Sequence, residues 1–185
     1  LGIRNTMPIF ISPINTATGL GLAAISFAYA VGQLSWGLTQ PFAGMMMARW
    51  GNVPVLTAGG LMLALGTALA PWADSTFTLV LTVGLLSAGG AGLIGPSVVM
   101  ASLNQLLSPE RRAMGTSLVN AGGSLGQFFI VPLAQMIISG AGWAASLIVL
   151  GALATSVVPL ARMLRVTSGG TAHSAEVADV RVRDA

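Results

Sequence analysis

The sequence contains no cysteine and no lysine, and each absence excludes a class of protein. Without cysteine the chain has neither a disulfide framework nor a cysteine-ligated metal site. Its eight basic residues are all arginines, the formal net charge is +3, and never more than two arginines are adjacent. This is too sparse for the basic surface that binds nucleic acid, so no nucleic-acid partner is expected.

Charged residues of either sign are also scarce, at 7% of the 185 residues, and positions 5–48 carry none. Ordinary globular domains contain roughly 25% charged residues. A soluble protein could not cover its surface with so few charges, whereas lipid tails readily solvate apolar side chains. With 54% hydrophobic residues and a mean hydropathy of +0.83, the chain is interpreted as an all-α protein of the lipid bilayer. We expect neither a cofactor nor a metal.

The two ends of the sequence differ from its apolar middle. The opening, LGIRNTMPIF, lacks the pattern of a signal peptide, because no basic region precedes the apolar run. Its first residue, a leucine, suggests a fragment or a processed product. Residues 166–185, which include His173, carry five charges in the last ten positions and are expected to be a disordered cytoplasmic tail or the start of a linker.

The length of a membrane helix divides the remaining sequence into spans. About 20 mostly apolar residues are needed to cross a core about 30 Å thick. This gives five complete crossings, and Pro96 is expected to bend the third of them. The first segment is too short to cross alone, so we interpret it as part of a helix whose beginning is missing, with a re-entrant segment as the alternative. The predicted spans are 1–14 (partial), 22–46, 54–71, 78–104, 112–138 and 143–164, within a half-bundle of residues 1–165.

The arginines predict the orientation of the spans, because cytoplasmic connections carry an excess of basic residues. Three places on one side of the membrane hold arginine, while the opposite connections hold only Asp74. We therefore expect the arginine side to be cytoplasmic, in a multi-pass protein of the cell inner (plasma) membrane. The arginines concerned are Arg49, Arg111, Arg112, Arg162 and Arg165.

Polar amides share one face of the predicted span 22–46 with glycines. The spacing of four, three and four residues places them on one side of a helix. Trp36 and Tyr29 lie near this stripe, where they could wall a cavity or equally face lipid or pack against other helices. The stripe consists of Gln33, Gly37, Gln40 and Gly44.

The stretch SPERRAMGTSLVNAGGSLGQFFIVP (108–132) carries two stripes. Its start is typical of a helix N-terminus, with Ser108 as the N-cap. One stripe contains Gly115, Gly122 and Gly126, and the last two have the GxxxG spacing that favours close packing of membrane helices. The other contains Asn120, Ser124 and Gln127, which predict either a wet cavity or hydrogen bonds between helices.

Arg4 is the residue most indicative of function. If the first segment ends near Asn15, a rise of about 1.5 Å per residue puts Arg4 roughly 16 Å deep, close to the bilayer midplane. An ionised residue there is costly and usually functional. The alternative is that the chain truly starts here and that Arg4 reaches an interface. With Asn5 beside it, Arg4 is a candidate ligand for a solute.

The connection GMMMARWG (44–51) joins two spans by a very short turn. Gly44 and Gly51 would permit close helix approach and a sharp reversal, and Arg49 can donate to carbonyls at a helix end. A generic tight loop with one orienting arginine is the alternative. We interpret Gly44, Arg49 and Gly51 as a cytoplasmic gating loop.

This connection resembles the loop between the second and third helices of the major facilitator superfamily, whose pattern is G-x-x-x-D-[RK]-x-G. Gly44, Arg49 and Gly51 match, whereas Ala48 stands in place of the acidic residue. GIRNTMPIF and PERRAMGTSLVNAGGSLGQFFIVPL are similar to the first helix and to the fourth-to-fifth helix region of the monocarboxylate-transporter and oxalate/formate-antiporter branch. The arginine that many proton-coupled relatives carry in the fourth helix is absent from 78–104.

The resemblance covers residues 1–165 and implies a six-helix half of a transporter that works with a C-terminal six-helix half by alternating access. The polar stripes and Arg4 would then face one central cavity that binds a small solute. An organic anion is the expected substrate, since a guanidinium binds a carboxylate through two hydrogen bonds. The residues expected to bind it are Arg4, Asn5, Gln33, Trp36, Gln40, Asn120 and Gln127.

The transporter interpretation has two alternatives. A non-transporting membrane subunit or truncated product that pairs with another membrane chain is the main alternative. A membrane-embedded enzyme is disfavoured, because the spans contain no Asp, Glu, His or Cys to activate a nucleophile. The same absence means that a proton carrier would have to come from elsewhere, or that transport is exchange or facilitated diffusion.

Overall fold

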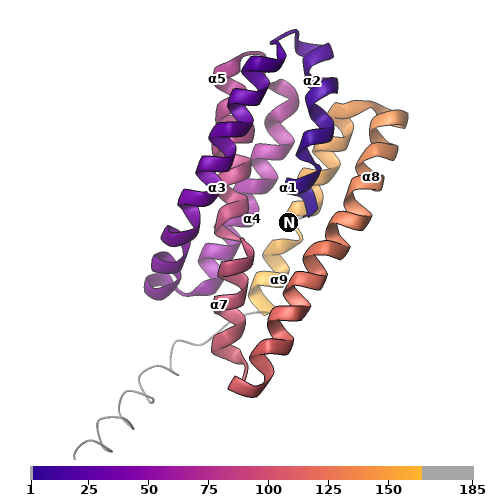
Figure 1. Cartoon of the computed structure of the whole chain (residues 1–185). Helices are drawn as coiled ribbons and strands as arrows, with labels where there is room; N and C mark the ends of the chain where they lie inside the picture. The colour runs from indigo at the N-terminus through magenta and orange to yellow at the C-terminus, as the bar shows by residue number, and fades with distance from the viewer. Residues whose placement is uncertain (1, 164–185) are drawn as a thin grey trace, which may run out of the picture.

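The computed structural model describes residues 2–163, without the side chains of residues 104–106 and 163, and these residues form helices and turns with no strand among them. The predicted tail, including His173, lies outside the described residues. The helices run roughly alongside one another in an elongated bundle (Figure 1). This confirms the expected all-α fold.

The first rod of the bundle is three helical pieces in a row. They are α1 (Gly2–Thr6), the 3-10 turn η1 (Met7–Phe10) and α2 (Ile11–Thr18). Helix α1 begins near mid-height of the bundle and α2 reaches one end (Figure 1). The rod ends where Gly19 takes the left-handed φ of 64° and its N–H donates to the carbonyl of Asn15 at 2.9 Å. The helical rod therefore continues four residues past the predicted limit.

The second and third helices are joined by a one-residue reversal. Helix α3 (Leu22–Trp50) is followed directly by α4 (Asn52–Leu69) and the 3-10 turn η2 (Ala70–Trp72). Gly51 between them has a φ of 85°, which a residue with a Cβ rarely adopts. The sharp turn expected at this glycine is present, and residues 47–50 belong to the helix and not to a loop.

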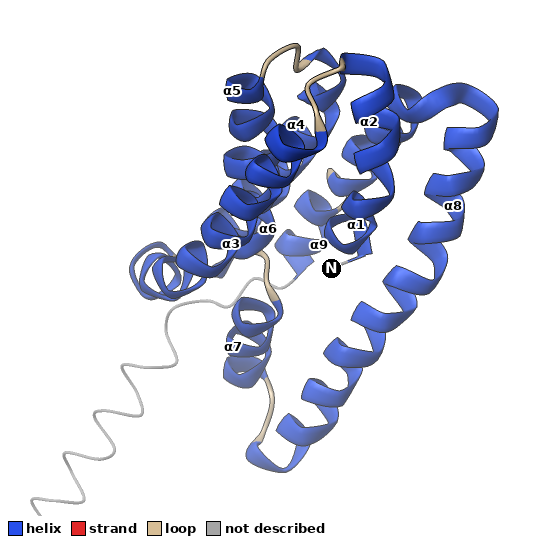
Figure 2. Cartoon of the chain, turned by 45° about the horizontal axis from the view of Figure 1, so that its top comes forward, coloured by secondary structure: helices blue, strands red, loops and turns tan. Residues whose placement is uncertain are grey.

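The next rod changes its helical form twice. A short α5 (Thr76–Leu79) passes into a π-helix, η3 (Val80–Ser87), and then into α6 (Ala88–Leu93). Helix α7 (Pro96–Leu106) begins at the proline, after a break visible as a loop between α6 and α7 (Figure 2). The predicted bend at Pro96 is confirmed, because proline lacks the N–H that a continuous helix needs.

The last part of the described chain forms a long hairpin. A 3-10 turn, η4 (Pro109–Arg111), leads into α8 (Arg112–Ala154), and α9 (Val157–Met163) completes it. Within α8, Gly142 has a φ of 87° and separates an ascending run from a descending one. This position falls between the predicted spans 112–138 and 143–164. Ser108 occupies the N-cap position of η4, but its side chain makes no capping hydrogen bond.

Three stretches of the described residues are long and apolar enough to cross a membrane: Asn52–Trp72, Thr76–Leu103 and Pro109–Arg162. The last contains both runs of the hairpin. Helix α3 is long enough, with 29 residues, but is not among the three. Its amides and hydroxyls lower its apolar character. Among them, Gln33 lines a cavity between helices and Gln40 contacts Ser97 of α7.

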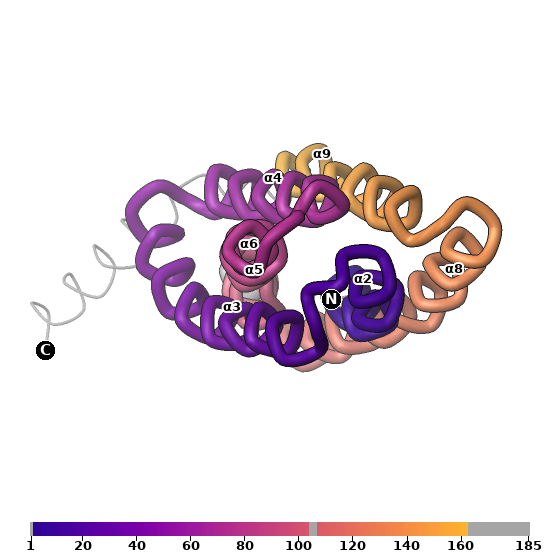
Figure 3. Tube along the Cα trace, turned by 90° about the horizontal axis from the view of Figure 1, so that it is seen from above, coloured from indigo at the N-terminus to yellow at the C-terminus, as the bar shows by residue number. Residues whose placement is uncertain are grey.

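Close helix packing depends on small residues at the centre of the bundle. Viewed from above, α5 and α6 lie between α3 and α4, and the first rod lies beside α8 (Figure 3). A Cβ on Gly66 of α4 would lie 2.3 Å from the backbone nitrogen of Ser87, and one on Gly90 of α6 would lie 2.4 Å from that of Leu63. No side chain fits at such distances, so these helices touch backbone to backbone.

The packing glycines predicted on α8 behave differently from one another. Gly115 is buried, and a Cβ there would lie 2.6 Å from Leu107. Gly126 faces α1, where a Cβ on Gly2 would lie 2.7 Å from the Gly126 carbonyl oxygen. Gly122 has no described atom within 4 Å of a Cβ position. Gly122 therefore makes no close contact within the described bundle, and its role in helix packing stays a prediction.

Candidate functional site

A cavity of about 250 Å³ opens where the first rod, α3 and the π-helical segment meet. Its polar lining comes mainly from α1 and α3, and its apolar lining from η1, η3 and the start of α6. The lining residues are Arg4, Asn5, Met7, Pro8, Tyr29, Gly32, Gln33, Val83, Ser87 and Ala88.

Arg4 is the charged residue in this lining, and its described partners are all neutral. One guanidinium nitrogen donates to Oε1 of Gln33, and another donates to Oδ1 of Asn5 at 3.3 Å. The guanidinium carbon also lies 4.2 Å from the centroid of the Trp36 ring, the geometry of a cation–π contact. Four of the predicted binding residues therefore meet at one point.

The regular spacing of α3 brings its residues to Arg4. Tyr29, Gln33 and Trp36 are separated by four and three residues, so they share one helical face. Tyr29 and Gln33 line the cavity, and the Trp36 ring lies under the guanidinium. Nε1 of Trp36 is buried and has no hydrogen-bond partner among the described residues, so the indole acts here through its ring.

Gln40 was predicted to bind solute but is occupied elsewhere. Its Oε1 accepts a hydrogen bond from the Ser97 hydroxyl at 2.7 Å, and its Nε2 donates to the Trp36 carbonyl at 3.5 Å. It does not line the cavity. Gln40 instead ties α3 to the first turn of α7, just after the break before Pro96.

The two amides predicted on α8 also lie outside the cavity lining. Asn120 is exposed, and its carbonyl accepts a hydrogen bond from the Ser124 hydroxyl at 3.3 Å within the same helix. Gln127 is half-buried. Their role in binding stays a prediction, because a stripe along one helix does not reveal how that helix is rotated against its neighbours.

Two polar residues of the lining are absent from the predicted binding set, although Tyr29 was named as a possible cavity wall. Tyr29 donates from its hydroxyl to the Met7 carbonyl at 2.7 Å, and its spacing from Gln33 was the signal that could have included it. Ser87 shares a buried hydrogen bond of 2.9 Å with Thr67 of α4. No periodic signal identifies Ser87, because the π-helix before it shifts the helical register.

The electrostatic character of the cavity follows from what surrounds Arg4. The carboxylates among the described residues, Asp74 and Glu110, both lie in exposed connections. Within residues 2–163 no group of three or more His, Cys, Asp or Glu side chains is placed to hold a metal. A half-buried cation held by neutral amides is suited to binding an anion, since neither of the described carboxylates cancels its charge.

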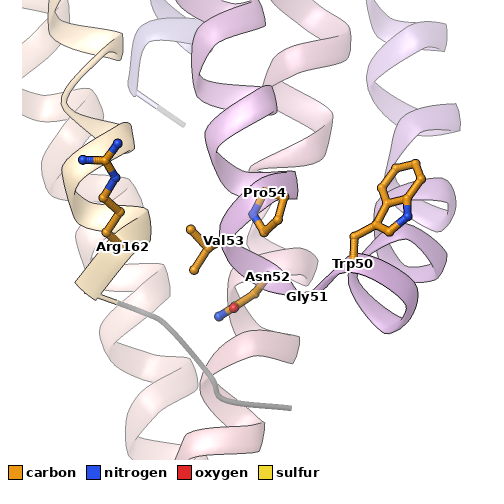
Figure 4. A pocket seen from close by; sticks show the side chains of 6 residues that line it. All are labelled: Trp50, Gly51, Asn52, Val53, Pro54 and Arg162. Atoms are coloured by element: carbon orange, nitrogen blue, oxygen red, sulfur yellow. The ribbon is translucent and has the colours of Figure 1, made fainter.

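The predicted gating loop lies by a second cavity, of about 410 Å³, lined by Trp50, Gly51, Asn52, Val53, Pro54 and Arg162 (Figure 4). Gly51 makes the turn there. Gly44, in contrast, has no described atom within 4 Å of a Cβ position, so close helix approach does not explain it. Arg49 is exposed at the last turn of α3 and is not part of the lining.

Comparison with known proteins gives a consistent result. The family model described as Major Facilitator Superfamily matches residues 1–180. The chain is 28% identical over 164 residues to rat "Monocarboxylate transporter 13". This match covers 89% of the chain and 38% of that protein. It is 31% identical over 128 residues to rat "Monocarboxylate transporter 4", covering 69% of the chain and 26% of that protein. The chain thus spans well under half the length of these relatives.

Proposed function

The chain belongs to the Major Facilitator Superfamily, and on this premise we propose that it is the N-terminal half of a transporter for a small organic anion, such as a monocarboxylate. The observation that carries the proposal is Arg4, a cation near mid-height of the bundle whose partners are Gln33, Asn5 and the Trp36 ring. The relatives are named monocarboxylate transporters, which supports a monocarboxylate as the solute class.

When a solute carboxylate binds, the Arg4 guanidinium would exchange its neutral hydrogen-bond partners for a charged one. The carboxylate accepts two hydrogen bonds from the guanidinium, and the amide oxygens of Gln33 and Asn5 give up theirs. Charge-assisted hydrogen bonds are roughly twice as strong as neutral ones, so the exchange favours an anion over a neutral solute. The Trp36 ring keeps the guanidinium plane in place during the exchange.

Transport requires a second half. We propose that a C-terminal six-helix half covers the open side of the cavity and that the two halves rock about it, so that the site faces each side of the membrane in turn. Large exposed apolar residues on α3 and α8 offer surfaces for this half and for lipid. They include Leu34, Leu38, Phe42, Leu118, Phe128 and Phe129.

The membrane orientation is part of the proposal. Arg49, Arg111, Arg112 and Arg162 lie at the ends of helices predicted to be cytoplasmic, in a plasma (inner) membrane. Since the spans predicted from the sequence contain no carboxylate or histidine, a proton carrier would belong to the other half. Exchange of one anion for another needs no such carrier.

The test is uptake by the full-length carrier reconstituted in liposomes, with labelled lactate, pyruvate and acetate as probes. Arg4→Gln should abolish uptake while the protein is inserted and folded normally. Arg112→Gln, which removes an exposed arginine far from the cavity, is the matched control and should retain uptake. Uptake by Arg4→Gln at the wild-type rate would refute the proposal.

A further inference from the structure

Two hydrogen bonds and one cation–π contact join the first rod to one face of α3. Only one of these three involves the main chain of the rod. Gln33 and Trp36 contact the side chain of Arg4, whereas the Tyr29 hydroxyl donates to the carbonyl of Met7 at 2.7 Å. The rod and α3 run in opposite directions, so Tyr29 and Met7 meet about one turn from the Arg4 contacts. The Tyr29 contact does not involve the guanidinium of Arg4.

The hydrogen bond lies where the rod is weakest. Pro8 has no N–H, so the α-helical bond to the Arg4 carbonyl cannot form. Residues Met7–Phe10 adopt a 3-10 turn instead, which winds more tightly than an α-helix. The form of this turn therefore sets the direction in which Arg4 points relative to α2.

The two sides of this turn pack against different helices. On the α2 side, Phe10 and Ile14 are almost fully buried in the core. On the other side, the five residues of α1 pack against α8, where Gly2 closely approaches Gly126. The Tyr29 bond to Met7, the residue directly after α1, ties this part of the rod to α3, the same helix that carries Gln33 and Trp36.

We propose that Tyr29 is a positioning residue for Arg4. Its hydroxyl fixes the backbone at Met7, which keeps the guanidinium over Trp36 and aimed into the cavity. Tyr29 makes no described contact with Arg4 itself, so it acts through the backbone. This inference rests on the proposed function, because it assigns Tyr29 to the same anion site.

The experiment uses the full-length carrier in liposomes and compares two hydroxyl deletions. Tyr29→Phe removes only the donor to Met7. Ser146→Ala is the matched control, because the Ser146 hydroxyl donates to the Ala134 carbonyl at 3.1 Å, is buried, and lies outside the cavity lining. KM and maximal rate are measured with whichever of lactate, pyruvate and acetate is taken up fastest, together with the melting temperature of each variant.

Tyr29→Phe should raise KM by about three- to tenfold, the effect of one hydrogen bond, with the maximal rate within about twofold of wild type. Ser146→Ala should lower the melting temperature comparably and leave KM unchanged. A purely structural role for Tyr29 predicts the same behaviour for both variants. If Tyr29→Phe does not fold, Pro8→Ala, which lets the rod continue as an α-helix and turns Arg4 away, should raise KM instead.

Each failure has its own pattern. If Arg4→Gln abolishes uptake but Tyr29→Phe leaves KM within twofold of wild type, the positioning role is overturned and the anion site stands. If Tyr29→Phe fails to fold and Pro8→Ala leaves KM unchanged, the positioning role is likewise overturned. If Arg4→Gln transports like wild type, or the unaltered carrier takes up none of the probes, the proposed function fails and this inference fails with it.

Discussion

The guanidinium of Arg4 lies 4.2 Å from the ring centroid of Trp36, which is 32 residues further along the chain, on the antiparallel helix α3. The contact orients a charge that no described carboxylate neutralises. Because Nε1 of Trp36 has no described hydrogen-bond partner, the ring itself provides the interaction. The orientation of the Arg4 guanidinium in the cavity therefore depends on the face of the Trp36 ring.

Replacing Trp36 tests this contact directly. Trp36→Leu should raise KM for the transported anion by about five- to twentyfold, since a partly desolvated cation–π contact is worth about 1–2 kcal/mol. Trp36→Phe keeps an aromatic face and breaks no described hydrogen bond, so its KM should rise less. Equal effects of the two substitutions on KM, measured in reconstituted liposomes, would contradict the assignment.

The contact of α4 with the π-helix predicts an intolerant glycine. A Cβ at position 66 would collide with backbone atoms of Ser87 and Thr82, which cannot move aside as a side chain can. Gly66→Ala should therefore lower the free energy of unfolding by about 1–3 kcal/mol or prevent insertion. Gly140→Ala, where a Cβ meets nothing within 4 Å, is the control. The melting temperature of each variant in detergent checks this. Equal melting temperatures for Gly66→Ala and Gly140→Ala would argue against the observed packing.

The two glycines of the predicted gating loop should respond differently to alanine. Gly51 has a φ of 85° and a ψ of 171°, a conformation almost restricted to glycine, so Gly51→Ala should cost about 1–3 kcal/mol of stability. Gly44 lies in regular helix with open space around it, and Gly44→Ala should be neutral or slightly stabilising. The melting temperatures of the two variants check this, and a larger loss at position 44 would contradict it.

Gln40 and Ser97 should contribute to stability and not to solute affinity. Ser97→Ala removes the donor to Gln40 and should lower the free energy of unfolding by about 1 kcal/mol, with KM within twofold of wild type. Ser117→Ala is the control, because that hydroxyl bonds only to its own helix, at the Ala113 carbonyl. If Ser97→Ala changed KM but not the melting temperature, Gln40 would contribute to solute binding, contrary to this prediction.

Much of the fold follows from the scarcity of charge and from local chain chemistry. The membrane class, the turn at Gly51 and the break at Pro96 depend on composition or on one residue, so the sequence predicts them. The cluster of Arg4 with Gln33 and Trp36 was also predictable, because the helix period relates Gln33 to Trp36 and the depth of Arg4 marks it as exceptional.

What the sequence could not predict has one physical cause. The spacing of Asn120, Gln127 and Gly122 predicts a common face on α8 but not the direction in which that face points. Rotation about the helix axis depends on contacts with other helices, such as the packing of Gly2 on Gly126. The π-helix at Val80–Ser87 likewise has no signal in the spacing of apolar residues, and it brings Ser87 into the cavity.

The most direct test of the anion site is protection of a single cysteine from chemical labelling. These 185 residues contain no cysteine, so Asn5→Cys, in a full-length carrier freed of any others, reports on the exposed residue beside Arg4. Lactate should slow labelling of this cysteine by an impermeant thiol reagent and leave Asp74→Cys, in an exposed connection, unaffected. Labelling of Asn5→Cys at the same rate with and without the anion, in protein that transports it, would contradict a solute site at Arg4.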